Sequence, residues 1–186
     1  MTIVAADVLD FWFMGDAAIR RKQWFEKNAA FDEACGRFGA AIRLARDGAF
    51  DDWAASAEGG LALIVLLDQL SRNIFRGLPE AFAADPKALA IARSLVARQC
   101  DVTLQPFQRL FVYLPFEHAE SIADQTESVR LFETIREALG EDTIAYAHRH
   151  RDVIARFGRF PHRNFILGRV STAAELDYLA EPGAGF

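Results

Sequence analysis

The sequence predicts an all-α fold, and three observations support that prediction. No stretch of roughly four to eight residues alternates apolar and polar side chains between turn signals, so we expect no β-strand. Segments of roughly 10 to 20 residues with helical periodicity are instead separated by Gly, Pro and short polar links. Helices of this length with short connections pack as antiparallel pairs.

The length and composition fit one domain. With 186 residues, of which 52% are hydrophobic, the chain is large enough to bury a bulky core without a metal or a disulfide. We therefore expect a single helical domain over residues 1–186. The ordered part should cover roughly residues 3–180, and the tail with the sequence EPGAGF should be loose.

Three helical regions are expected in the first part of the chain. Residues 5–14 should form a short helix. Asn28 is placed to cap a helix of about twenty residues that stops near Gly48. Residues 61–75 are the most hydrophobic segment and are apolar on most sides, which is typical of a buried central helix.

Proline marks the starts of later helices. At Asp85-Pro86 the acid is expected to be the N-cap and the proline to take the first helical position. Pro115 predicts the start of a long helix that ends near Gly140. Residues 141–157 should form the next helix, which Gly and Pro then break.

Positive charge is concentrated in residues 148–169, although the chain is acidic with a net charge of −5. This stretch holds six arginines and three of the four histidines against one acid. The acidic total argues against nucleic-acid binding, whose affinity comes mostly from neutralised phosphates. The local excess of arginine predicts a site for a small anion.

The sharpest signal in the basic stretch is the phrase FGRFPHRN, in which Gly and Pro shape a turn before a short helix. The turn carries four polar residues: Arg159, His162, Arg163 and Asn164. Helix starts attract anions, and arginine forks bind carboxylate or phosphate at two points. Before the turn, Arg156 lies on the polar side of the helix and His150 on its apolar side. The alternative is that these arginines cap carbonyls and pair with nearby acids.

Asp68 and Arg72 fall on one stripe of the hydrophobic segment, and Arg76 joins them if the helix extends that far. An acid four residues before a base is the favourable order for an ion pair. Because the neighbouring positions are apolar, the pair should be partly buried and structural. A role for Arg72 and Arg76 in binding a ligand is the other interpretation.

His118 and Gln125 share one face of the helix that Pro115 is expected to start. Glu117 and Glu120 lie on a more polar side. Their spacing matches neither HExxH nor the paired Glu-x-x-His of a di-iron bundle. The sequence also lacks GxSxG, the P-loop pattern and a GxGxxG after a strand. We therefore expect no metal and no cofactor, and no motif assigns a reaction.

The cellular location is expected to be cytoplasmic. The first residues lack a basic leader, and the densest apolar run is far shorter than the roughly 20 residues that cross a membrane. Cys35 and Cys100 have no paired spacing, which fits a reducing compartment. No membrane contact is expected.

Several phrases together resemble a bacterial family catalogued as domain of unknown function 924. They are VLDFWF, WFEKNAAFD, LALIVLLDQLSRNIFRG, FAADPKALA, FVYLPFEHAE and HRHRDVIARFGRFPHRNFILGR. The resemblance implies a tetratricopeptide-like helical fold, although no strict 34-residue repeat is visible, so any repeats would be degenerate. It implies no established activity. The chain departs from the family pattern at Leu70-Ser71 and at Ala119 but keeps Gln69 and Asn73.

Two functional hypotheses follow. In the first, a phosphate- or carboxylate-bearing small molecule binds among arginines, with His118 and His162 as proton carriers that Asp68 and Glu120 orient. The predicted ligand-binding residues are Arg72, Asn73, Arg76, Gln125, Arg156, Arg159, Arg163 and Asn164. In the second, the protein is a tetratricopeptide-like interaction module that binds an acidic peptide or a partner protein.

Overall fold

The computed structural model describes residues 3–185, and every regular element within that range is helical, which confirms the all-α prediction. The α-helices are α1 (Ala5–Phe13), α2 (Ala29–Cys35), α3 (Gly39–Arg46), α4 (Ala57–Ile64), α5 (Ser71–Ile74), α6 (Asp85–Ala97), α7 (Pro106–Glu117), α8 (Ile122–Glu133), α9 (Arg136–Leu139), α10 (Glu141–Phe157) and α11 (Ala173–Leu179). Short 3-10 segments are η1 (Lys22–Trp24), η2 (Gly36–Phe38), η3 (Asp51–Ala55), η5 (Pro79–Ala81), η6 (Asp101–Thr103) and η7 (Pro161–Arg163). The segment η4 (Val65–Leu70) is π-helical.

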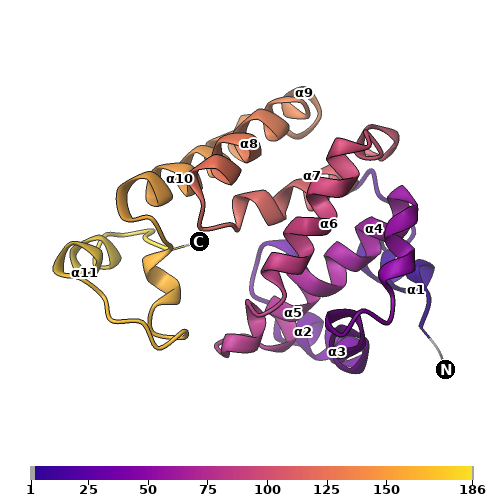
Figure 1. The fold of residues 1–186 in the computed structure, drawn as a ribbon, viewed down its shortest axis with the longest axis horizontal. Helices are drawn as coiled ribbons and strands as arrows, with labels where there is room; N and C mark the ends of the chain where they lie inside the picture. The colour runs from indigo at the N-terminus through magenta and orange to yellow at the C-terminus, as the bar shows by residue number, and fades with distance from the viewer. Residues whose placement is uncertain (1–2, 186) are drawn as a thin grey trace.

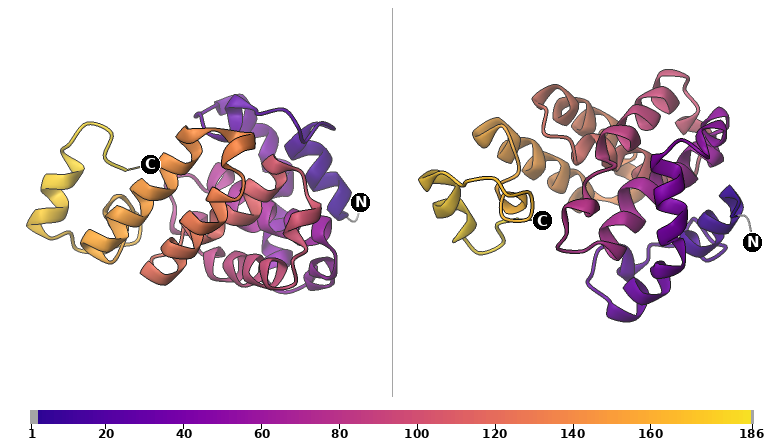
Figure 2. Two further views of the ribbon diagram at one scale, coloured as in Figure 1. Left: turned by 90° about the horizontal axis from the view of Figure 1, so that it is seen from above. Right: turned by 60° about the horizontal axis from the view of Figure 1, so that its bottom comes forward.

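The first seven helices form the main body, and the C-terminal helices extend from it (Figure 1). Helix α4 packs against α1, α6 and α7, whereas α8 packs against α7 and α10. Figure 2 shows that α11 projects away from the α1–α7 body, whereas the first half of α10 joins the main core through Ile144 and Ala147. A small separate apolar cluster of Val153, Ile154 and Phe160 holds this projecting part together. The tetratricopeptide-like arrangement stays a prediction.

The central segment is buried as its composition predicts. Every residue from 59 to 71 is buried, and these side chains lie at the middle of the main hydrophobic core. The prediction of one continuous α-helix over residues 61–75 is wrong, because Val65–Leu70 is π-helical. A π segment is rare and often occurs at functional sites. Here it places the only buried acid of the segment, Asp68, in the core.

Two other predicted helix boundaries need correction. Asn28 does cap α2, where its side chain accepts the N–H of Phe31, but η2 divides the expected twenty-residue helix into α2 and α3. Pro115 does not start a helix: it lies inside α7, and the next helix, α8, begins after its cap Ser121. The chain therefore turns between α7 and α8, and His118 lies at that turn.

The start of α6 also differs from the expectation. Ala84 is the N-cap, and Asp85 is already the first helical residue, with no side-chain cap hydrogen bond. Its carboxylate is bound by arginines instead. Helix α10 ends as predicted, because Gly158 adopts a left-handed conformation with φ of 71° that suits a residue without a Cβ atom. This turn directs the chain back toward the main body through η7.

Candidate functional site

Asp68 is the centre of a buried polar network. Its Oδ1 atom lies 2.8 Å from His118 Nδ1 and 3.0 Å from Arg72 Nη1, and the side chain is fully buried. Burial alone would raise the pKa of Asp68. The positive charge of Arg72 and the hydrogen bond from His118 outweigh that effect, so the pKa is lowered and the carboxylate is ionised at neutral pH.

His118 is held in one orientation at the end of α7. Because the Asp68 carboxylate can only accept a hydrogen bond, His118 Nδ1 carries the proton, and Nε2 of the neutral ring is an acceptor. Burial, together with the charge of Arg72, lowers the pKa of His118 despite the opposite effect of Asp68. The neutral ring therefore offers Nε2 as a base, in the same arrangement that a carboxylate gives a catalytic histidine.

Gln125 holds the turn that carries His118. Its Nε2 atom donates to the carbonyl oxygens of Glu117 at 2.6 Å and Ala119 at 2.8 Å. The side chain is fully buried from solvent. Gln125 therefore positions His118 through the backbone, and the amide donor that was expected to bind a ligand is already used.

Asp85 brings two arginines together. Arg72 of α5 donates to it from both ends of its fork, with Nη1–Oδ1 and Nη2–Oδ2 distances of 3.0 and 2.9 Å. Arg163 of η7 donates to the same carboxylate, with Nη1 3.3 Å from Oδ2. We call Asp68, Arg72, Asp85, His118 and Arg163 the central network; it joins the hydrophobic core to the C-terminal part of the chain.

Arg163 is the least compensated member of the central network. Its residue exposure is 6%, and its guanidinium lies between the rings of Phe82 and Phe160, 4.8 and 4.6 Å from their centroids. Within residues 3–185 its buried Nε atom has no hydrogen-bond partner. Burial and the charge of Arg72 lower the pKa of Arg163 to about 10, so it is still a cation at neutral pH.

Two further buried titratable groups lie beside the central network. Burial, with the charge of Asp68, raises the pKa of Glu117 to about 8. His150 lies 3.6 Å from it, measured from Nδ1 to Glu117 Oε1, and the same Nδ1 is 2.9 Å from the carbonyl of Tyr146. Burial lowers the pKa of His150 to about 3, so both groups are mainly neutral at pH 7.

His162 and Glu120 lie at the border of this region. Burial and the charge of Arg163 lower the pKa of His162 to about 4. Glu120 accepts the N–H of Phe160 at 2.8 Å and both ends of the Arg169 fork. Burial would raise the pKa of Glu120, but these bonds lower it. Glu120 thus anchors the chain just before η7.

Other predicted ligand residues are engaged away from the central network. Arg76 and Asn73 both bind Asp32 of α2. The Arg159 guanidinium donates two hydrogen bonds to the carboxylate of Glu175 in α11. Arg156 lies over the ring of Phe157, and Asn164 donates a hydrogen bond to Ser171. The Oδ1 atom of Asn164 is buried with no hydrogen-bond partner in residues 3–185.

The structure therefore brings together only part of the predicted set. Asp68, Arg72, His118 and Arg163 meet, with His162 at the edge. Sequence reasoning missed two members of the region. Asp85 was assigned to a helix cap, and Glu117 to the polar side of a helix. The available signal for Glu117 was an acid embedded in the apolar run FVYLPFEH.

Two surface hollows lie away from the central network. One, of about 400 Å³, is lined by residues that include Arg109 and Arg136, and another, of about 620 Å³, by residues that include Phe11 and Phe31. In the described range 3–185, no three His, Cys, Asp or Glu side chains are grouped so that they could hold a metal ion. No helix there has the length and apolar character that crossing a bilayer requires.

The fold and the central network define an all-helical protein with a buried Asp–His pair and two arginines that share a carboxylate. The chain belongs to the family described as bacterial protein of unknown function (DUF924), whose model matches residues 8–183. It is similar to the solved structure of the protein of unknown function ATU0120 from Agrobacterium tumefaciens, with 42% identity and a TM-score of 0.86. That match covers 96% of this chain and 97% of the other. No curated protein matches.

Proposed function

We propose that the protein binds a small carboxylate- or phosphate-bearing molecule at Arg163, with Arg72 as the second cation and the Asp68–His118 pair as a proton carrier. The observation that carries this proposal is the state of Arg163. A guanidinium has five N–H donors, yet within residues 3–185 this buried one makes a single hydrogen bond, of 3.3 Å, to a carboxylate that Arg72 already holds. An anion that reaches Arg163 would supply the missing acceptor.

Energetic reasoning supports a ligand role over a purely structural one. A buried charge with incomplete partners costs several kcal/mol, whereas replacing a buried ion pair by apolar side chains is often neutral or stabilising. Phe82 and Phe160 already surround Arg163 with an apolar environment. A side chain that served packing alone would be better apolar here, so the retained cation favours a function in recognition.

The charge balance of the central network predicts proton uptake on binding. Arg72 and Arg163 offset the charges of Asp68 and Asp85, while Glu117 and the nearby histidines are mainly neutral. A bound anion would therefore add one uncompensated negative charge. That charge would raise the pKa of His118, which could then take up a proton at Nε2.

A binding module for an acidic peptide or partner protein is the second candidate. The observation in its favour is an exposed apolar surface next to the basic turn: Phe165 is 95% and Val170 87% exposed. Both residues lie between Arg163 and the start of α11. Under this alternative, Phe165→Ser would abolish capture of an acidic peptide but would leave the binding of inorganic phosphate unchanged.

Thermal shift with inorganic phosphate and with citrate tests the first proposal. Ligand at about 100 times its dissociation constant stabilises a protein by about 2.7 kcal/mol. We expect stabilisation of the wild type, its loss in Arg163→Lys, and its retention in the matched control Arg76→Lys, whose guanidinium is bound by Asp32. Equal responses of the two variants, or no stabilisation of the wild type at millimolar ligand, would contradict the proposal.

A further inference from the structure

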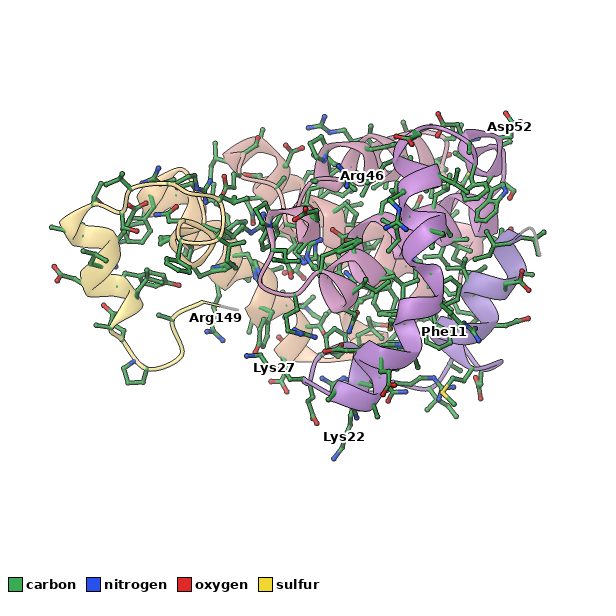
Figure 3. All side chains as sticks on the ribbon, turned by 90° about the horizontal axis from the view of Figure 1, so that it is seen from below. Phe11, Lys22, Lys27, Arg46, Asp52 and Arg149 are labelled. Carbon is green, nitrogen blue, oxygen red and sulfur yellow. The ribbon has the colours of Figure 1, made fainter. Side chains whose placement is uncertain are left out.

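The segment that follows α11 returns to the basic stretch. The carbonyl of Gly183 accepts a hydrogen bond from Arg149 Nη2 at 3.1 Å. Two residues later, Gly185 lies so close to His162 that an added Cβ atom would be 3.1 Å from His162 Cβ. Figure 3 labels Arg149 beside the end of this segment, and the two views of Figure 2 agree on its return.

One anchor point, His162, is the last ring of a row of rings that leads to His118. The ring centroids of His118 and His150 are 6.5 Å apart, and those of His150 and Phe160 are 5.6 Å apart. Phe160 and His162 continue the row at 5.6 Å. Because Gly185 lies against His162, the segment reaches the His162 end of this row.

Few buried contacts hold residues 181–185 in place, so the segment can open and close reversibly. Helix α11 ends at Leu179, and residues 181–183 are exposed, whereas residues 184 and 185 are half-buried. Gly183 and Gly185 both have a φ of 79°, which an L-residue adopts only with strain. Segments with few buried apolar contacts and exposed hydrogen bonds open more readily than the core.

We propose that residues 181–185 form a strap that covers the His162 side of the anion site and must move aside for a ligand to enter. The proposal concerns regulation of the site, so its ligand-dependent part rests on the proposed function above. The strap itself is a claim about access to His162, and that access is measurable without any ligand.

Labelling with diethyl pyrocarbonate at neutral pH, read by mass spectrometry for each histidine, measures that access. Gly185→Ala should disfavour the strap through its φ and its contact with His162, and we expect about a tenfold faster modification of His162. Gly15→Ala is the matched control, because Gly15 also has a positive φ but has open space around it. His148 of α10, whose charge acts on Glu133 of α8, should react equally in all variants.

A second variant removes the other anchor without altering the backbone. Arg149→Ala deletes the donor to Gly183, and Arg151→Ala removes an exposed arginine of the same helix that pairs only with its neighbour Asp152 among the described ion pairs. We expect faster labelling of His162 in Arg149→Ala and none of this effect in Arg151→Ala. Unchanged labelling of His162 in both Gly185→Ala and Arg149→Ala would overturn the strap, whether or not phosphate binds.

Phosphate titration then separates the strap from the anion site. A chain that ends at Ala180, with its fold verified by circular dichroism, should bind inorganic phosphate more tightly than the full chain. Faster labelling without any phosphate binding would leave the strap standing and would refute the anion site. Phosphate affinity that stays the same in the shortened chain and in Gly185→Ala would overturn the gating role.

Discussion

Two arginine clamps on neighbouring turns of the same segment differ in burial and in completeness. In the outer clamp, Arg76 and Asn73 both bind Asp32, and Arg76 has a side-chain exposure of 44%. In the inner clamp, Arg72 and Arg163 share Asp85, and the Arg163 side chain is only 7% exposed. Asp32 therefore accepts hydrogen bonds from one arginine and one neutral amide, whereas two arginines bind Asp85.

The two clamps differ in the burial and the hydrogen-bond partners of their arginines. The pKa of Asp32 is lowered because hydrogen bonds from Arg76 and Asn73 outweigh the effect of its burial. This is the behaviour of an ordinary surface ion pair. In the inner clamp the pKa of Arg163 falls to about 10 because burial and Arg72 oppose its charge. Only the inner clamp holds a buried guanidinium whose Nε atom has no hydrogen-bond partner within residues 3–185.

Removing the inner carboxylate should have the largest effect. Asp85→Ala leaves Arg72 and Arg163 facing each other without their shared partner, and breaking a buried pair in this way costs about 3 to 5 kcal/mol. Urea unfolding at neutral pH measures the loss. A cost below about 1 kcal/mol would mean that the inner clamp behaves like a surface ion pair.

The pH dependence of stability tests the raised pKa of Glu117, which lies beside the inner clamp. Its folded pKa of about 8 lies above the usual value of 4.5, so its contribution is fully present below pH 4.5 and is lost as pH rises through about 8. His118 and His150 beside it are neutral over the upper part of that window. Unfolding free energies of Glu117→Gln should therefore fall less steeply with rising pH than those of the wild type.

Glu127→Gln is the control for that measurement. Glu127 has a lowered pKa, because it accepts hydrogen bonds from Arg130 on the surface. It therefore does not change the stability of the protein as pH rises above 4.5. Its pH profile should run parallel to the wild type above pH 4.5. If the unfolding free energies of Glu117→Gln and the wild type have the same slope between pH 4.5 and about 8, the carboxyl group is ionised in the folded protein.

The outer clamp should give the smallest effect. Asp32→Ala removes the partner of a half-exposed arginine, and such pairs contribute about 0 to 1 kcal/mol and weaken with salt. Urea unfolding at low and high ionic strength measures this contribution. A loss as large as that of Asp85→Ala would remove the distinction between the two clamps.

Several local features of the fold and site were predictable from the sequence. The apolar run from Leu61 to Leu67 predicted a buried central segment, and the spacing of Asp68 and Arg72 predicted their ion pair, which forms at 3.0 Å. His150 was correctly placed on the apolar side of its helix. These features depend on side-chain periodicity along one helix, which the chain carries locally.

Side-chain periodicity along one helix could not predict the contacts between segments that are distant in the sequence. His118 lies 50 positions from Asp68, and Arg163 lies 78 positions from Asp85, so no helical period relates them. The π segment escaped prediction as well, because its sequence has the same apolar character as an α-helix. Asp85 looked like a helix cap because its neighbour is proline, a local signal that the two arginines override.

The sequence alone determined that this protein is helical, that its centre is apolar, and that its positive charge gathers in residues 148–169. Tertiary structure decided which of those arginines remain surface ion pairs and which one is buried with an incomplete partner. The physical reason is that helix periodicity arises within about four residues, whereas the charge around a buried group depends on every element packed against it.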